Sequence, residues 1–167
     1  MGKCLHIALV LTAVAVICQL IGLASPYWVA YESPSINAHS GLWKVCFEII
    51  RTEKTECQDI ETMEDWFKAV RAMSILGFLV LLVPVVLLLL KLFVLKEQKQ
   101  LLLAAIGAAF AGALFILISI AVYSGKKNEM FASSISINFH FAFVFCIIGM
   151  LAAIGSGVVM LVEKSRD

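Results

Sequence analysis

The sequence is dominated by four long hydrophobic runs with polar stretches between them. The runs contain no charged residue, and each has about the 20 residues that a helix needs to cross the hydrocarbon core of a bilayer. Because backbone groups inside lipid must find hydrogen-bond partners within their own segment, we expect each run to form a continuous helix. The uncharged runs cover residues 5–24, 72–90, 101–123 and 139–162.

With their flanking residues, these runs predict a single membrane domain, 1–167, that crosses the bilayer four times. An even number of spans places both termini on the same side. The first run could instead be a cleaved signal peptide, because Lys3 precedes it and Gly22-Leu23-Ala24 resembles a cleavage site. The predicted spans are 5–24, 71–92, 101–123 and 139–162, the connections are 25–70, 93–100 and 124–138, and the tail is 163–167.

The long connection contains a segment, 43–49, in which hydrophobic and polar residues alternate. The hydrophobic side carries Trp43, Val45, Phe47 and Ile49. An alternation of period two predicts a half-buried strand. The polar residues 51–56 predict a reversal, after which Cys57 returns opposite Cys46. Residues 28–31 are expected to add a partner strand, because an isolated hairpin is only marginally stable.

Cys46 and Cys57 are therefore candidates for a disulfide bond near the tip of this hairpin. A small loop with little core is stabilised by such a bond if the loop faces an oxidising compartment. The alternative is a pair of free thiols in a cytosolic loop. The other cysteines, Cys4, Cys18 and Cys146, lie in or beside predicted helices, where cysteine packs as a small hydrophobic residue.

The end of the long connection predicts the start of the second helix. Thr62 can cap this helix, with Asp65 in the first turn near the positive end of the helix dipole. Trp66 and Phe67 are then expected at the membrane interface, where aromatic rings are favoured. Arg71 has two interpretations: its side chain reaches outward to water, or it ties the loop to the helices through carbonyls or a carboxylate.

Composition excludes several classes of protein. Hydrophobic residues make up 62% of the 167 residues, charged residues only 15%, and the mean hydropathy is +0.98. A soluble domain of this size has too little interior for so much apolar surface, and disorder requires the opposite composition. A net charge of +1 gives no sign of a nucleic-acid partner. Lysine and arginine divide almost evenly between the two sides of the membrane, so charge alone leaves the orientation open.

No group of residues indicates catalysis, a metal or a cofactor. The histidines His6, His39 and His140 are dispersed, and no cysteine pair has the spacing of a redox or zinc motif. No glycine-rich loop resembles a phosphate cradle. Without a charge inside any hydrophobic run, an ion path through the helices is not expected. We therefore expect a non-enzymatic protein without a cofactor.

Small residues recur at four-residue intervals in the third and fourth hydrophobic runs. Such stripes let helices approach closely in lipid. They can pack within one chain, which is the favoured interpretation, or form a lateral interface with another protein. Pro84 should bend the second helix. The repeats are Ala104/Ala108/Gly112, Ala105/Ala109/Ala113 and Gly149/Ala153/Gly157.

The order of residues in the first loop resembles that of the claudin/peripheral myelin protein/epithelial membrane protein superfamily. That pattern is a tryptophan, then Gly-Leu-Trp, then two cysteines, in the first loop of a four-span protein. Residues 66–72 resemble the family's entry to the second helix, and 121–125 the exit of its third. The residues that match this signature are Trp28, Gly41, Leu42, Trp43, Cys46, Cys57 and Arg71.

The surroundings of Gly-Leu-Trp are most similar to the lens fibre intrinsic membrane protein and the claudin-domain-containing type. The last residues, Lys164-Ser165-Arg166-Asp167, lack the Tyr-Val ending of junctional claudins. No PDZ scaffold is therefore expected as a partner. The fourth helix also lacks the tryptophan pattern of the lens-type members, so the subfamily stays open.

The resemblance implies a left-handed bundle of four transmembrane helices with a small extracellular antiparallel β-sheet. Both loops would be extracellular and both termini cytoplasmic, in the plasma membrane, at cell junctions or in intracellular vesicles. The implied function is membrane organisation, cell–cell contact or junction formation, through self-association in cis or trans or with other membrane proteins. The alternatives are a paracellular barrier or cation pore, in which Asp59 would set charge selectivity, and an auxiliary subunit of a channel or receptor.

Overall fold

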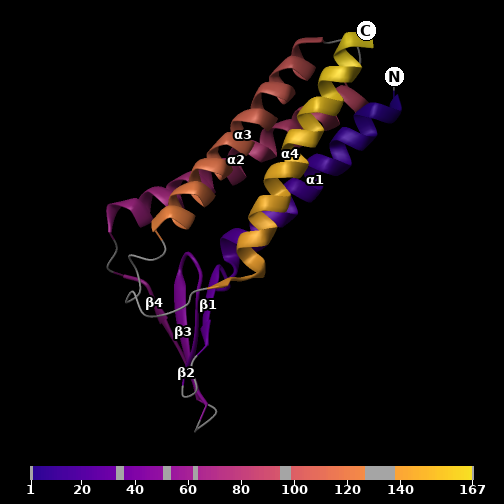
Figure 1. Ribbon diagram of the computed structural model, residues 1–167. Helices are drawn as coiled ribbons and strands as arrows, with labels where there is room; N and C mark the ends of the chain where they lie inside the picture. Colours follow the sequence, from indigo (N-terminus) through magenta and orange to yellow (C-terminus); the bar gives the residue numbers. More distant parts are fainter. Residues whose placement is uncertain are drawn as a thin grey trace.

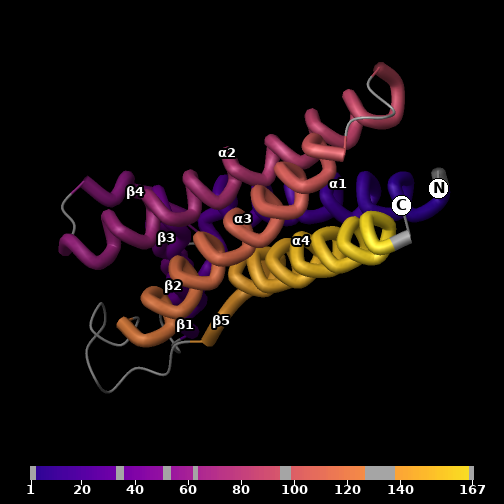
Figure 2. The backbone as a smooth tube through the Cα atoms, turned by 90° about the horizontal axis from the view of Figure 1, so that it is seen from above, coloured from indigo at the N-terminus to yellow at the C-terminus, as the bar shows by residue number. Residues whose placement is uncertain are grey.

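The computed structural model describes residues 2–32, 36–50, 54–61, 64–94, 99–126 and 138–166. The hydrophobic runs form four α-helices, each long and apolar enough to cross a membrane, as the sequence predicts. α1 packs mainly against α4, and α2 mainly against α3, so that the start of α1 and the end of α4 lie together, far from the sheet (Figure 1, Figure 2). The helices are α1 (Gly2–Ala24), α2 (Asp65–Phe93), α3 (Lys99–Lys126) and α4 (Phe141–Arg166).

Small residues hold the helices close together inside the chain. A Cβ atom on Gly77 of α2 would lie 2.8 Å from Ile116 of α3, and one on Gly112 of α3 would lie 2.7 Å from Leu81 of α2. In α4, a Cβ atom on Gly149 would lie 3.1 Å from the Ala15 carbonyl oxygen of α1. These glycines therefore serve packing within one chain, the interpretation that the sequence favours. Ala105, Ala109, Ala113 and Ala153 are buried with them.

Polar side chains inside the bundle hydrogen-bond across helices. The hydroxyls of Ser74 in α2 and Ser119 in α3 lie 2.7 Å apart, and Ser119 also donates to the Val70 carbonyl at 3.1 Å. Thr12 of α1 and Ser156 of α4 form a second pair, at 2.6 Å. Each pair satisfies groups that would otherwise be costly to bury in lipid.

The second helix begins where the end of the long connection predicts it, before the membrane span that is expected from residue 71. α2 starts at Asp65, with Glu64 as its N-cap residue, so its first turns project beyond the hydrophobic run toward the sheet. The predicted cap Thr62 lies outside the described residues. Pro84 lies within α2, which is unbroken from Asp65 to Phe93.

The fourth helix begins later than predicted. Phe139 is in a strand and pairs with Val29, and the His140 backbone N–H donates to the Trp28 carbonyl at 2.9 Å. These sheet contacts keep the chain extended until Phe141, where α4 starts. α4 then continues through most of the predicted tail. Most of the second loop, and residues 95–98 of the short loop, lie outside the described residues.

In the described part of the chain, five strands form one antiparallel sheet in the order β4-β3-β2-β1-β5, which projects from one end of the bundle (Figure 1). The predicted hairpin is present as β3 and β4. The partner of β3 is β2, however, and not the 28–31 segment, because residues 36–40 form a strand that the alternation pattern does not mark. The strands are β1 (Val29–Glu32), β2 (Ile36–Ser40), β3 (Lys44–Ile49), β4 (Lys54–Asp59) and β5 (Asn138–Phe139).

The alternation predicts a half-buried strand, but in β3 the hydrophobic side is largely the exposed one. Val45 is half-buried, but Phe47 and Ile49 are exposed, whereas Cys46 on the opposite side is buried. The helices reach only the base of the sheet, so nothing among the described residues covers the far part of this face.

Candidate functional site

The two signature tryptophans cap the C-terminal end of α1. The indole N–H of Trp28 donates to the Gly22 carbonyl at 2.6 Å, and that of Trp43 donates to the Leu23 carbonyl at 2.8 Å. Carbonyls in the last turn of a helix lack partners within the helix. For Gly22 the reason is specific: the residue four positions later is Pro26, which has no N–H to donate.

Trp28 is also the centre of the core between the sheet and the bundle. Its side chain is fully buried. The centre of its ring lies 4.8 Å from the ring centre of Tyr123 in α3 and 5.7 Å from that of Phe143 in α4. Both contacts have the edge-to-face geometry that aromatic pairs prefer. Trp28 thus joins the start of β1 to α1, α3 and α4.

The turn between β2 and β3 requires glycine. A Cβ atom on Gly41 would lie 2.5 Å from the Pro26 Cα atom and would overlap the Ser25 carbonyl oxygen. These are backbone atoms, which cannot move aside independently. The close approach presses the turn against the end of α1, and Leu42 beside Gly41 is fully buried.

Arg71 ties this turn to α2, the second of the two interpretations from sequence. Its Nε–H donates to the Leu42 carbonyl at 2.6 Å, and a terminal N–H donates to the Ile60 carbonyl at 3.4 Å. Its guanidinium carbon also lies 4.5 Å from the centre of the Trp43 ring, a cation–π contact. Arg71 therefore joins the end of β4, the β2–β3 turn and α2.

Cys46 and Cys57 form a disulfide bond between β3 and β4. The two residues are directly opposite each other in the ladder. The prediction that the bond lies near the hairpin tip is wrong: the ladder continues three pairs beyond it, to Ile49 opposite Lys54. The disulfide therefore fixes the middle of the hairpin, closer to the helices.

Asp59 lies at the end of β4, paired with Lys44 of β3. The Asp59 carboxylate and the Lys44 ammonium are 3.7 Å apart, and both side chains are largely exposed. The long loop carries more acidic than basic residues overall. Asp59 is not an isolated charge, because Lys44 lies beside it.

Beyond the disulfide, four large hydrophobic side chains of the described residues are partly exposed at the far end of the sheet. Ile36 is directly opposite Ile49, which places both on the face that carries Phe47, and Ile50 follows at the end of β3. Their exposed fractions lie between 40% and 46%. We call Ile36, Phe47, Ile49 and Ile50 the distal apolar patch.

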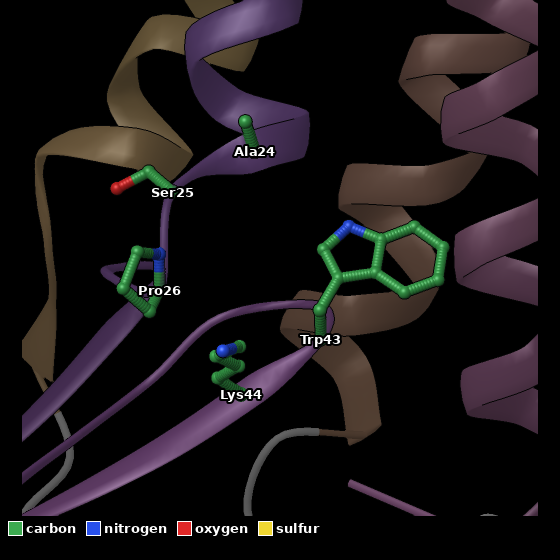
Figure 3. Close-up of a pocket in the computed structure, with 5 residues that line it drawn as sticks. All are labelled: Ala24, Ser25, Pro26, Trp43 and Lys44. Atoms are coloured by element: carbon green, nitrogen blue, oxygen red, sulfur yellow. The ribbon is translucent and has the colours of Figure 1, made fainter. Parts of the chain in front are cut away.

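A small cavity lies where α1 ends and the sheet begins, lined by Ala24, Ser25, Pro26, Trp43 and Lys44. The Trp43 ring stands on one side and Ser25 and Pro26 on the other, with Ala24 toward the helix and Lys44 toward the sheet (Figure 3). We call it the interfacial cavity. Among the described residues, no group of three or more histidine, cysteine or acidic side chains is placed to hold a metal ion.

These features, an arginine-tied Gly-Leu-Trp turn and a cross-linked hairpin above four membrane-crossing helices, agree with a family model that matches residues 1–160. The model is that of the PMP-22/EMP/MP20/Claudin family. The chain belongs to this family. A comparison with curated proteins gives no match.

As a member of the PMP-22/EMP/MP20/Claudin family with four spans, the chain is a multi-pass membrane protein. The structure brings the signature residues Trp28, Gly41, Leu42, Trp43 and Arg71 together where the sheet meets the bundle. It leaves Asp59 at the outer edge strand and the distal apolar patch at the far end. The signature residues are recognisable in the sequence, but the capping of α1 is not, because its signal there is a single proline, Pro26, four residues after Gly22.

Proposed function

We propose that this tetraspan protein makes contacts between membranes through the distal apolar patch. In this proposal the protein lies in the plasma membrane, with the sheet outside the cell and both termini in the cytoplasm. The Cys46–Cys57 disulfide supports that orientation, because such bonds persist in oxidising compartments. The expected partner is a second copy of the chain, in the same or an opposed membrane, or another membrane protein.

The single observation that carries the proposal is the contrast between the two ends of the sheet. The base is held by Trp28, Trp43 and Arg71, whereas the far end presents four exposed, large hydrophobic side chains. An exposed cluster of this kind beyond the membrane is typical of a protein-interaction site. The rigid base would hold the patch at a fixed distance from the bilayer.

The experiment uses cells that do not adhere to one another and that express the protein with a fluorescent label. The wild-type protein should be enriched at contacts between two expressing cells, but not at contacts with a non-expressing cell. The double variant Phe47→Ser/Ile49→Ser should lose the enrichment while keeping its surface level. Glu48→Ser is the matched control, since Glu48 lies between them on the opposite face. Enrichment that survives the double variant would contradict the proposal.

The same cells test the orientation and the other candidate functions. A C-terminal epitope should bind antibody only after permeabilisation if the termini are cytoplasmic. A location in intracellular vesicles would favour a trafficking role, and copurification with a large channel would favour an auxiliary subunit. For a paracellular cation pore, dilution potentials across a monolayer should change with Asp59→Asn. Unchanged potentials would remove the pore.

A further inference from the structure

The interfacial cavity lies at the depth where a membrane changes from hydrocarbon to headgroups. Its upper boundary is Ala24, the last residue of α1 and the end of its membrane-crossing segment. The exposed indole of Trp43 forms a wall, and tryptophan is favoured at membrane–water interfaces. A molecule in this cavity would be in contact with both the bilayer and the sheet.

The lining is amphipathic in a definite direction. Ala24 lies toward the helix, Trp43 and Pro26 form apolar walls, and Lys44 places an ammonium group toward the sheet (Figure 3). The Ser25 hydroxyl, on the same side as Pro26, is the other polar side-chain group of the lining. A phospholipid has the same order along its length, with acyl chains in the membrane and an anionic phosphate above them. The order of groups in the cavity therefore matches that ligand.

A line of large exposed side chains on α1 leads from the membrane to the cavity. Val10, Val14, Ile17 and Leu20 are 39–63% exposed, and with Ala24 they recur every three or four residues, which places them on one side of the helix. From residue 10 to residue 24 a helix rises about 21 Å. Half of the hydrocarbon core is about 15 Å. The line is long enough for an acyl chain of one leaflet.

The charges around the cavity favour an anion beside Lys44. The C-terminal end of α1 would repel an anion, but its Gly22 and Leu23 carbonyls accept the two indole N–H groups. Arg71, on the Trp43 ring, already donates to backbone carbonyls. Among the described residues, the one ion pair of Lys44 is the exposed contact with Asp59 at 3.7 Å. Exposed ion pairs are weak. A phosphate can therefore compete with Asp59 for the Lys44 ammonium.

We propose that the interfacial cavity binds a membrane glycerophospholipid, with its phosphate on Lys44 and an acyl chain along the Val10–Ala24 side of α1. The site needs only the membrane spans and the geometry at the end of α1. It is therefore independent of the proposed role in membrane contact.

The test is a titration of the detergent-solubilised full-length protein with palmitoyl-oleoyl-phosphatidylglycerol, read as bound lipid by native mass spectrometry. Lys44→Ala should weaken binding about tenfold, the size expected for one charge-assisted hydrogen bond. Asp59→Asn should strengthen binding, because the competing carboxylate is removed. Lys54→Ala, at the far end of the hairpin, is the matched control and should leave binding unchanged.

Two further measurements separate a lipid site from related sites. Soluble sn-glycerol 3-phosphate should bind far more weakly than the lipid, and equal binding would mean a free-phosphate site. Dioleoylglycerol, which lacks the phosphate, should also bind weakly, and equal binding would mean an apolar groove without a headgroup site. Either result, or equal weakening by Lys54→Ala and Lys44→Ala, would overturn the proposal. An unfolding temperature in detergent close to that of the wild-type protein shows that each variant is folded, and the opposite effects expected for Lys44→Ala and Asp59→Asn cannot arise from misfolding alone.

Discussion

Replacing Trp28 with phenylalanine tests whether the first signature tryptophan stabilises the protein as a cap on α1. The substitution keeps an aromatic ring beside Tyr123 and Phe143 but removes the N–H that donates to the Gly22 carbonyl. Because Pro26 cannot donate in its place, that carbonyl would be left without a partner in a buried position. Water has little access there, since the Trp28 side chain is fully buried.

The expected cost is the sum of two effects. An unsatisfied buried acceptor costs about 1–3 kcal/mol, and the smaller ring gives up roughly 1–2 kcal/mol of buried apolar contact. A loss of roughly 3 kcal/mol corresponds to a fall in Tm of roughly 6–12 °C for a chain of this size. The measurement is thermal unfolding of the protein in detergent micelles, followed by size-exclusion chromatography of the soluble fraction.

Trp43→Phe is the matched control, because it removes the same donor from the neighbouring carbonyl of Leu23. Trp43 is 38% exposed, so water can reach this carbonyl after the substitution. We expect a loss below about 1 kcal/mol, the net value of an ordinary hydrogen bond. Equal losses for the two variants, or a loss below about 1 kcal/mol for Trp28→Phe, would refute the capping argument.

Three further changes test other contacts that hold the sheet in place. Gly41→Ala should reduce stability and surface delivery, whereas Gly107→Ala, whose Cβ atom would meet nothing within 4 Å, should leave both unchanged in the same unfolding and surface-labelling assays. Arg71→Lys keeps the charge but loses the planar pair of donors that bind the Leu42 and Ile60 carbonyls. Protease should therefore cut the 54–61 segment more readily in this variant, and an unchanged digestion pattern would contradict the expectation. Cys46→Ser should cost about 2–5 kcal/mol and prevent surface delivery, and mass spectrometry that found both thiols free in wild-type surface protein would remove the basis of this prediction.

Much of the architecture follows from the sequence alone because its signals are local. A run of uncharged residues as long as a bilayer is thick favours a membrane helix. Residues 5–24, 72–90, 101–123 and 139–162 therefore predict four spans. The alternation around Cys46 likewise predicts the β3–β4 hairpin. The family signature marks Trp28, Trp43 and Arg71 as important, but it does not state what they contact.

The burial of each strand face and the pairing of β5 depend on the position of the sheet relative to the helices, which only the tertiary structure shows. The alternation predicts a buried side for β3, but burial depends on what lies opposite, and the bundle reaches only the base. β5 escapes detection because its pairing depends on residues distant in sequence, as in the contact of Phe139 with Val29. β2 pairs with its neighbours in the chain, but the alternation pattern does not mark its residues.

The sequence by itself therefore determined four apolar runs of membrane length and a hairpin that places Cys46 opposite Cys57, because helix length, strand period and cysteine spacing are properties of short segments. Only the tertiary structure decided how that hairpin is attached. Two indole groups satisfy carbonyls at the end of α1, and one guanidinium joins a turn, a strand end and α2. Those hydrogen bonds link residues from 6 to 29 positions apart, and such partners are set by the packing of the whole chain.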